Sequence, residues 1–268
     1  MPLVLVQSNV KIGVMHIDVL TLFPAMFLGP LQESILKRAQ ERGHLTIIIH
    51  QLRDYAFDRH QLTDDLPYGG GEGMLLKPEP ILQAVRAIRG TAEFPVVLLS
   101  PQGRLFNQAV TQELAQHSRL LLICGHYEGF DERVRIALQP DEISIGDYVL
   151  TGGELPAMVM IDALARWIPG VLGDDESARQ DSFAGGLLEG PQYTRPLEVG
   201  GIEVPEVLRS GNHAAISRWR RQEALRRTWL RRPELLTRTE LSSEDRKFVA
   251  QLEHIAPESG ATSNNGNR

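Results

Sequence analysis

Three short segments of the sequence combine glycines with polar side chains, and each accompanies an apolar run. They are residues 100–103 (SPQG), 125–129 (GHYEG) and 144–154 (SIGDYVLTGGE). Glycines in such places let the main chain approach a flat ligand closely, and the turns expose N–H and C=O groups to it. Any one segment also fits an ordinary turn after a strand. Three that converge on one edge of a sheet favour a ligand site.

Other kinds of site are disfavoured by the same sequence. None of the three segments matches the glycine fingerprint of a dinucleotide site or of a P-loop, so a small-molecule dehydrogenase is an unfavoured alternative. No His, Cys and Glu cluster has zinc-ligand spacing, so we expect no metal site. Cys124 is the single cysteine, which excludes an internal disulfide, and it fits a small core residue better than a nucleophile.

The elements that must position the three segments alternate between strands and helices. We expect strands at residues 15–23, 45–50, 95–100, 120–124 and 142–145, and helices at 31–42, 80–90, 108–116, 131–138 and 155–167. This alternation predicts an α/β fold with a mostly parallel sheet covered on both faces. Ligands of such sheets bind beyond the carboxyl ends of the strands, where all three segments lie.

The chain changes character after residue 172. Residues 173–201 are acidic and rich in glycine, which predicts a flexible linker between domains. Residues 202–255 predict a small all-α domain with helices only, whose core positions we expect to include Trp219, Leu225, Trp229 and Leu230. The tail 256–268 has few apolar residues and is expected to be disordered.

Composition limits the class of protein. The 268 residues are 42% hydrophobic and 23% charged, which is ordinary for a globular protein, and no apolar run is long enough to cross a membrane. With no secretion signal visible, a cytoplasmic location is expected. The net charge is −6, yet residues 209–238 hold nine arginines against two glutamates. This asymmetry indicates a surface for a polyanion, although an arginine-rich helix solvated on one face fits equally.

Several longer motifs together identify a family. They are PYGGGEGM, LSPQGRLF, CGHYEGFDERV, SIGDYVLTGGELPAMVMID, RWIPGVLG, DSFAGGLLEGPQYTRP, VPEVLRSGNHAAISRWR and TWLRRPELL. In this order they resemble the bacterial tRNA (guanine-N1-)-methyltransferases, the TrmD family of the SPOUT superfamily, from Met15 to about Leu236. His126 departs from the Arg that the family usually has there. Residues 1–14 lie outside the resemblance and are expected to be an N-terminal extension, with Met15 as an alternative start.

The resemblance implies a trefoil knot in the C-terminal part of an α/β domain spanning residues 15–172. In the family, S-adenosylmethionine lies in this knot, held largely through main-chain contacts. The matching cofactor-binding positions in this sequence are Leu99, Ser100, Pro101, Gly125, Tyr127, Glu128, Ile145, Gly146, Asp147, Tyr148, Val149, Leu150, Gly152, Gly153 and Pro156. Periodicity and spacing do not indicate a knot, because knots are rare exceptions to the usual topology rules.

The activity that the resemblance implies is methyl transfer to N1 of guanine 37, immediately 3′ to the anticodon. Asp181, in the linker, matches the family's general base for the N1 proton, and Arg166 matches the residue that stabilises charge on guanine O6. Taken alone, Asp181 also fits a helix cap and Arg166 also fits a cation at the end of a helix. Another SPOUT methyltransferase, acting on a different base or a ribose 2′-hydroxyl, and a non-catalytic RNA-binding protein remain alternatives.

The resemblance also implies partners. The family is a homodimer in which the linker of one subunit reaches the cofactor site of the other. The anticodon arm of tRNA would bind the basic cluster, which consists of Arg218, Arg220, Arg221, Arg226, Arg227, Arg231 and Arg232. Magnesium is an optional further cofactor, since the family is stimulated by it, but no dedicated metal site is visible.

Overall fold

The computed structural model describes residues 14–173, 178 and 181–255, and the chain divides into two compact units, residues 1–178 and 179–268. The N-terminal extension up to residue 13, the tail 256–268 and six linker residues (174–177, 179 and 180) lie outside the described residues. Of the segment expected as a linker, residues 181–201 fall in the second unit. No helix in the described ranges is long and apolar enough to span a membrane.

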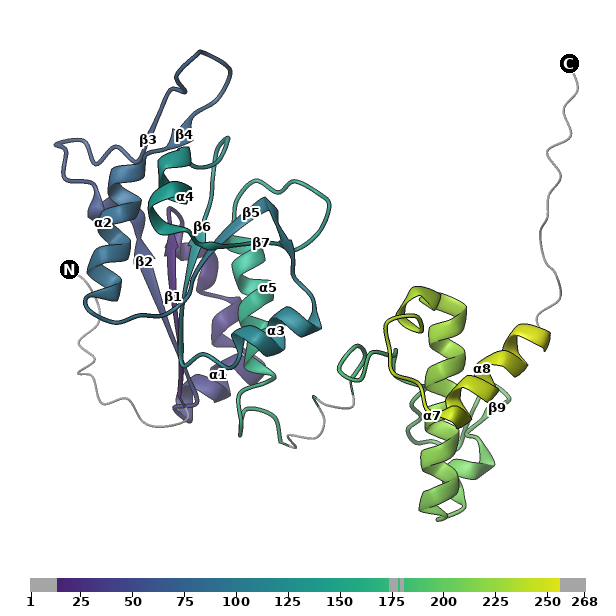
Figure 1. The fold of residues 1–268 in the computed structure, drawn as a ribbon. Helices are drawn as coiled ribbons and strands as arrows, with labels where there is room; N and C mark the ends of the chain where they lie inside the picture. The colour runs from purple at the N-terminus through teal and green to yellow at the C-terminus, as the bar shows by residue number, and fades with distance from the viewer. Residues whose placement is uncertain (1–13, 174–177, 179–180, 256–268) are drawn as a thin grey trace, which may run out of the picture. The chain divides into compact units, whose positions relative to one another are not determined.

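The first unit is built on a five-stranded sheet in the order β2-β1-β6-β5-β7 (Figure 1). Every neighbouring pair is parallel, which confirms the expected α/β class with a mostly parallel sheet. The strands are β1 (Met15–Thr21), β2 (Leu45–Gln51), β5 (Val96–Leu105), β6 (Arg119–Cys124) and β7 (Asp141–Ser144). Their apolar runs follow from burial on both faces.

Helices cover the two faces of this sheet (Figure 1). One face packs against α1 (Ser34–Glu41), α3 (Gln108–Leu114) and α5 (Glu154–Ala165), and the other packs against α2 (Pro78–Arg89) and α4 (Glu132–Leu138). Side chains of β6 alternate between the two cores: Leu120 and Leu122 point to the first, Leu121 and Ile123 to the second. All four are fully buried.

Two expected helices begin elsewhere. The helix expected over residues 31–42 is a 3₁₀ turn, η2 (Pro30–Gln32), followed by α1, because Glu33 is extended and Ser34 has a φ of 49°. The amide of Gln40 donates to the freed carbonyl of Leu31 at 2.6 Å. The helix expected from Pro80 begins at Pro78, since proline suits the first helical position. Gly43, at φ 74°, ends the α1 segment as expected.

Strand β5 is longer than the apolar run predicts. The expected strand 95–100 continues to Leu105, and its register against β7 shifts between Leu99 and Arg104. The segment 100–103 is therefore a bulge within a strand and not a loop after it. Pro101 cannot donate a ladder hydrogen bond, which favours an interruption of the ladder at this position.

Short elements complete the first unit. They are the 3₁₀ turns η1 (Pro24–Phe27) and η3 (Leu52–Tyr55), and the antiparallel pair β3 (Asp64–Asp65) and β4 (Leu75–Leu76). The glycine-rich loop 67–74 joins β3 to β4. Its position thus follows from a hairpin that the sequence did not predict.

The second unit contains α7 (His213–Arg231), α8 (Ser243–Ile255) and the 3₁₀ turns η4 (Glu206–Arg209) and η5 (Pro233–Leu235). It also contains a hairpin of β8 (Glu198–Val199) and β9 (Ile202–Glu203), so the expectation of helices only over residues 202–255 is incomplete. Gly200 and Gly201, at φ 62° and 81°, form the turn. A Gly-Gly pair is a hairpin signal that was available in the sequence.

The helices of the second unit pack through a small core. Leu225 of α7 is buried as expected, whereas Leu230 is 65% exposed and its expected core position is wrong. These two leucines are five residues apart, so they lie on different faces of the helix. Trp219 and Trp229 are partly buried.

Candidate active site

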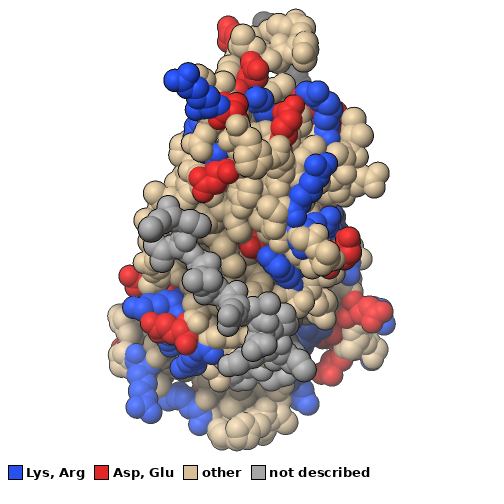
Figure 2. Space-filling view, turned by 90° about the vertical axis from the view of Figure 1, so that its left-hand side faces the viewer, with Lys and Arg blue, Asp and Glu red and all other residues tan. Residues whose placement is uncertain are grey.

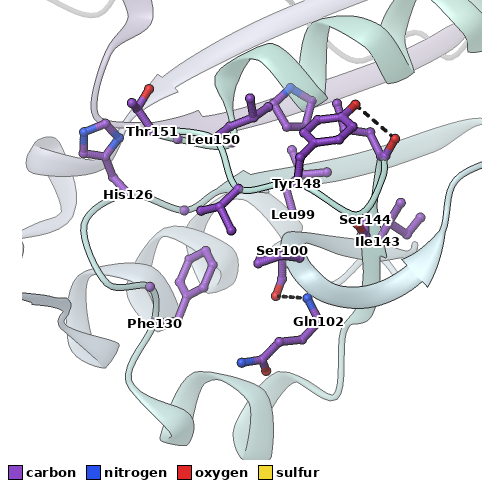
Figure 3. Close-up of a pocket in the computed structure, with 18 of the residues that line it drawn as sticks. Leu99, Ser100, Gln102, His126, Phe130, Ile143, Ser144, Tyr148, Leu150 and Thr151 are labelled. Carbon is purple, nitrogen blue, oxygen red and sulfur yellow. Dashed lines mark hydrogen bonds between the residues drawn. The ribbon is translucent and has the colours of Figure 1, made fainter. Parts of the chain in front are cut away.

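The three segments singled out in the sequence form one cleft in the first unit (Figure 3). The bulge of β5, the loop after β6 and the loop after β7 line it, at the edge where the carboxyl ends of parallel strands are expected to hold ligands. The cleft has an empty volume of about 880 Å³, which includes space open to solvent. Its walls are the main chains of these segments and a few apolar side chains.

Nearly all of the expected cofactor positions line this cleft. They are Leu99, Ser100, Pro101, Gly125, Tyr127, Glu128, Ile145, Gly146, Tyr148, Val149, Leu150, Gly152, Gly153 and Pro156. Asp147 does not: its side chain is exposed, and the residue is absent from the lining. The structure therefore brings together positions up to 57 residues apart in the sequence, from Leu99 to Pro156.

The loops approach one another through their backbones. Gly153 N–H donates to the carbonyl of Gly125 at 2.8 Å. A Cβ on Gly153 would lie 2.7 Å from the Cα of Cys124, closer than side-chain carbons are found, so only glycine fits there. At Gly103 a Cβ would lie 2.3 Å from the backbone N of Ile143. Glycines at these two positions make the crossing of the segments possible.

The loop after β6 is held in a strained conformation. Tyr127 has a φ of 58°, in the left-handed region that non-glycine residues seldom adopt, and its side chain is 43% exposed. Glu128 N–H donates to the carbonyl of Met74 at 3.0 Å, which fastens this loop to the end of the glycine-rich loop 67–74. Strain of this kind is typical of ligand-binding segments that the surrounding fold holds in place.

The loop after β7 is closed on itself by short-range hydrogen bonds. Tyr148 O–H donates to the carbonyl of Ile145 at 3.2 Å (Figure 3). Ser144 O–H donates to the carbonyl of Gly146 at 3.0 Å. On the opposite wall, Gln102 N–H donates to the hydroxyl of Ser100 at 3.1 Å. Each of these bonds joins residues two or three positions apart in the same segment.

The structure also shows a buried polar group beside the cleft, and the sequence did not reveal this group. Glu154, at the start of α5, is 1% exposed and accepts a hydrogen bond of 2.7 Å from the hydroxyl of Thr21. Its Oε2 and the Nδ1 of His126 both lie beside Gly152. That Nδ1 is buried and has no hydrogen-bond partner among the described residues. His126 lines the cleft and its ring contacts Phe23 at 4.8 Å between centroids.

Cys124 ends β6 directly before the cleft and is 2% exposed. Burial, and next the nearby charge of Glu154, raise the pKa of its thiol well above the ordinary value of 9.0. The thiol is therefore neutral at physiological pH, and the residue packs in the core, as expected.

Residues that the sequence analysis missed also line the cleft. They are Gln102, His126, Gly129, Phe130, Arg135, Ile143, Ser144 and Thr151. Five of them, Gln102, His126, Gly129, Ser144 and Thr151, lie inside the three segments, which were the available signal. Phe130 lies in the motif CGHYEGFDERV, whereas Ile143 of β7 and Arg135 of α4 lie outside the segments and the motifs.

The two expected catalytic residues lie in different units. Arg166 is half-buried at the carboxyl end of α5 in the first unit, and it does not line the cleft. Asp181 is half-buried at the start of a tight turn in the second unit, where Ala184 N–H donates to its carbonyl at 3.2 Å. Both side chains belong to residues that make further interactions within the protein.

The turn that carries Asp181 packs on the helices of the second unit. Leu188 N–H donates to the hydroxyl of Thr228 at 2.9 Å, and the hydroxyl of Thr239 donates to the carbonyl of Gly186 at 2.9 Å. Phe183 has a φ of 75° and its ring lies under the guanidinium of Arg232, 5.7 Å from its centroid. This segment is thus anchored to α7 rather than independent of it.

Most arginines of the basic cluster already have partners. Arg221 binds Asp245 at 2.9 Å, and Arg218, Arg226 and Arg232 lie near glutamates. Arg227 donates to the carbonyl of Glu189 at 3.3 Å. Within the described residues, Arg220 and Arg231 have no such partner. On the face drawn in Figure 2, basic side chains are interspersed with acidic ones rather than forming an unbroken basic surface.

No group of three or more His, Cys, Asp or Glu side chains suited to a metal ion is found among the residues that the structure describes. The expected absence of a dedicated metal site concerns the whole chain and stays a prediction.

Comparison with known proteins gives the family. The family model described as tRNA (Guanine-1)-methyltransferase TrmD matches residues 15–238. Three relatives are named tRNA (guanine-N(1)-)-methyltransferase: that of Dehalococcoides mccartyi is 60% identical over 240 residues (89% of this chain, 97% of the relative), that of Moorella thermoacetica 59% over 241 (89% and 96%), and that of Geotalea uraniireducens 56% over 247 (92% and 100%). This chain therefore belongs to the TrmD family of tRNA (guanine-N1-)-methyltransferases.

Proposed function

We propose that this protein transfers a methyl group from S-adenosylmethionine to N1 of guanine 37, immediately 3′ to the anticodon of tRNA. The observation that carries this proposal is the single cleft formed by three separate segments in a chain of this family. The reaction class follows from family membership. The cofactor, the target position and the roles of individual residues are inferred from the cleft and from the sequence motifs.

The residues present fit S-adenosylmethionine. Apolar side chains such as Leu99 and Ile143 suit an adenine ring, and the backbone of residues 144–153 offers N–H and C=O groups to its edge. The glycine at 153 allows its loop to lie directly against Cys124 and Gly125, because a Cβ there would lie 2.7 Å from the Cα of Cys124. When bound, S-adenosylmethionine supplies a methyl group that is already activated by its positively charged sulfur.

Asp181 is proposed as the general base. Neutral guanine carries a proton on N1, so the lone pair of N1 is not available for methylation until that proton leaves. A carboxylate within hydrogen-bond distance of N1–H takes this proton, a role that contributes roughly 10²–10⁴-fold to the rate. Support comes from the position of Asp181 in the DSF motif and from the anchored turn that holds it.

Arg166 is proposed to stabilise the negative charge that develops on guanine O6 when N1 loses its proton. A fixed guanidinium near O6 is worth more in a site that excludes water than in bulk solvent. Arg166 follows a rigid helix, α5, whose apolar residues are buried almost completely on one side. That attachment gives the guanidinium a defined starting position.

A homodimer is proposed to complete the site. Asp181 and the cofactor cleft belong to different units, and in this family the linker of one subunit reaches the cleft of the other. The exposed side of α5 begins with two apolar residues, Leu155 and Val159, which are one helical turn apart and 49% and 48% exposed, and it continues with Asp162. Neighbouring η1 adds Met26, with 42% exposed. Exposed apolar patches of this kind are typical of protein interfaces.

A trefoil knot is proposed for the part of the first unit around the cleft. Support comes from the crowding of the backbones there: Gly103 lies against residues 142–143 and Gly153 against Cys124 and Gly125. A chain threaded through a loop needs such close crossings.

A cytoplasmic location is proposed because tRNA is modified there. Magnesium has no assigned ligand among the described residues.

The second unit is proposed as an all-α domain, apart from its short hairpin, that binds the anticodon arm of tRNA. Its arginines would contact phosphates, which makes binding sensitive to salt. The ion pairs described above limit this role to the arginines that remain available, Arg220 and Arg231 first among them.

Mass spectrometry of the methylated nucleoside tests the proposal. The protein is incubated with S-adenosylmethionine and a tRNA transcript carrying guanine at position 37, and with a matched transcript carrying adenine there. We expect N1-methylguanosine from the first transcript and no methylated nucleoside from the second. A 2′-O-methyl product, or equal methylation of both transcripts, would contradict the assignment.

A further inference from the structure

The second unit contains a pocket that the proposed methyl transfer does not use, although one of the arginines proposed to contact phosphates, Arg220, lines it. It lies between residues 191–197, residues 204–209 and the first half of α7. All of its lining residues belong to the second unit, so its shape does not depend on how the two units are arranged. It is separate from the cofactor cleft, which lies wholly in the first unit.

The floor of this pocket is apolar. Val204, Leu208, Ile216 and Pro191 line it and are half-buried, and the exposed Pro196 lies beside them in the lining. The segment that forms one wall packs closely on α7. A Cβ placed on Gly190 would lie 3.2 Å from the carbonyl oxygen of Arg220. A concave apolar floor with a fixed wall suits a flat ring.

The rim of the pocket is positively charged. Arg195, Arg209 and Arg220 line it, and no acidic residue is among the lining residues. Arg209 lies 3.8 Å from Glu203, a pair exposed on both sides that contributes little. Arg195 and Arg220 have no carboxylate within ion-pair distance in the described part of the unit.

The arginines on the other side of α7 behave differently. Arg221 and Arg218 face α8 and lie 2.9 Å and 3.7 Å from the carboxylates of Asp245 and Glu244. The helix therefore has one side whose positive charge is neutralised within the protein and one side, at the pocket, whose charge is not. Uncompensated guanidinium groups around an apolar floor are complementary to a phosphate attached to a ring.

An aromatic ring stands at the edge of the same pocket. Tyr193 lines it, is 46% exposed, and lies 6.3 Å from the ring of Trp219 between centroids. The ring is thus supported from one side and accessible from the other. Aromatic rings next to arginines are the usual means by which proteins hold unpaired RNA bases.

We propose that this pocket binds one unpaired nucleotide of the tRNA, other than the guanine that is methylated. The base lies on the apolar floor beside Tyr193, and the adjoining phosphates contact Arg195 and Arg220. The proposal rests on the proposed function only in taking tRNA as the RNA. It assigns to the second unit a defined nucleotide site in addition to diffuse attraction of the phosphate backbone.

Binding of tRNA to pocket variants tests this inference, with Kd measured over a range of salt concentrations. The double variant R195Q/R220Q is expected to bind about tenfold more weakly, and the slope of log Kd against log salt is expected to fall by about one per arginine. Tyr193→Ala is expected to lose about tenfold in affinity, whereas Tyr193→Phe, which keeps the ring, is expected to bind like the wild type.

Lys247→Gln provides the matched control, because it removes an exposed positive charge from α8 outside the pocket. Equal losses in this control and in the pocket variants would overturn the proposal in favour of diffuse electrostatic binding. Binding of free AMP in the pocket, without an effect of the variants on tRNA, would also overturn it. The two proposals fail separately: a failure of the proposed function would leave the wild type unable to methylate guanine 37, whereas a failure of this inference would leave the tRNA affinity and the salt slope of the pocket variants unchanged.

Discussion

At the scale of single residues, the proposed chemistry depends on one carboxylate. Asp181 is the only acidic residue of its turn, and the turn around it is closed by hydrogen bonds that involve Phe183, Ala184 and Leu187. Asp181 lies two residues before a strained position, because the φ of Phe183 is in the left-handed region. Replacement of the carboxylate by an amide keeps size and shape, so it isolates the proton-accepting role.

Asp181→Asn is expected to lower kcat by about 10²–10⁴-fold, because an amide does not accept the N1 proton. Binding of tRNA and of S-adenosylmethionine is expected to stay within a few-fold of the wild type. Single-turnover methylation and binding titrations measure the two effects. Glu240→Gln removes an exposed negative charge of the same unit and serves as the control. Unchanged turnover in Asp181→Asn would refute the role of general base.

At the scale of elements, the turn of Asp181 is positioned by α7 and the segment after it. Thr228 is fully buried and its hydroxyl accepts from Leu188 N–H while donating to the carbonyl of Ala224 at 2.7 Å. The hydroxyl of Thr239 also holds this turn, by donating to the carbonyl of Gly186 at 2.9 Å. These hydroxyls connect the turn of Asp181 to the rest of the second unit, which is proposed to bind tRNA.

Thr228→Val is expected to lower kcat about tenfold with little change in the KM for tRNA, because the turn loses an anchor and shifts the carboxylate. Thr228→Ser, which keeps the hydroxyl, is expected to restore kcat. Thr237→Val is the matched control, since its hydroxyl donates to Glu234 on the surface and does not contact the turn. A loss of thermal stability with unchanged kcat in Thr228→Val would assign Thr228 a structural role alone.

The central strands also hold a buried charge. Asp18 of β1 is 1% exposed, and its oxygens lie 2.8 Å from His50 Nε2 and 2.8 Å from Arg119 Nε. Burial raises the pKa of Asp18, but the hydrogen bonds from His50 and Arg119 and the charge of Arg119 outweigh it, so the pKa lies below its ordinary 3.8. A lowered pKa means that the ionised carboxylate stabilises the folded state.

Asp18→Asn is therefore expected to reduce the free energy of unfolding at neutral pH by about 1–3 kcal/mol. The contribution of the carboxylate is fully present above the unfolded-state pKa and is lost as the pH falls through the lower folded-state pKa. The difference between variant and wild type should thus be constant from neutral pH down to about pH 5 and shrink below the ordinary pKa of 3.8. Denaturant unfolding at several pH values measures it, and a difference that grows toward acid pH would contradict the assigned sign.

Sequence patterns predicted most elements and missed specific features for physical reasons. Buried parallel strands and capped helices leave local signatures, so β6 and the cap at Asn107, which accepts from Ala109 N–H and Val110 N–H, were predictable. The bulge in β5 and the burial of Glu154 arise from contacts between distant segments, which no local pattern records. The cleft was predicted because the sequence places glycines in three segments expected at the carboxyl edge of one sheet, and the structure shows that two of these glycines, Gly103 and Gly153, have no room for a Cβ.

At the scale of the whole molecule, the proposed site divides between two copies of the chain. Each chain supplies a cofactor cleft in its first unit and an Asp181 in its second unit. If the carboxylate acts in the partner's cleft, a defect in either part can be complemented by a partner that carries the other defect. Leu150→Glu, at an exposed position that lines the cleft, is chosen to block the cofactor without disturbing the core.

Neither Leu150→Glu nor Asp181→Asn is expected to methylate tRNA alone. A refolded equal mixture should regain about a quarter of wild-type activity, since half of the dimers are mixed and each mixed dimer contains one site free of both substitutions. Labelled-methyl transfer to tRNA measures the recovery. As a control, the double variant is mixed with wild type: if Asp181 acts in the partner's cleft, these mixed dimers contain no intact site, and only the quarter of dimers that are wild type stay active. An inactive mixture of the two single variants, formed under conditions in which mixed dimers are detected by mass, would show that each chain uses its own Asp181.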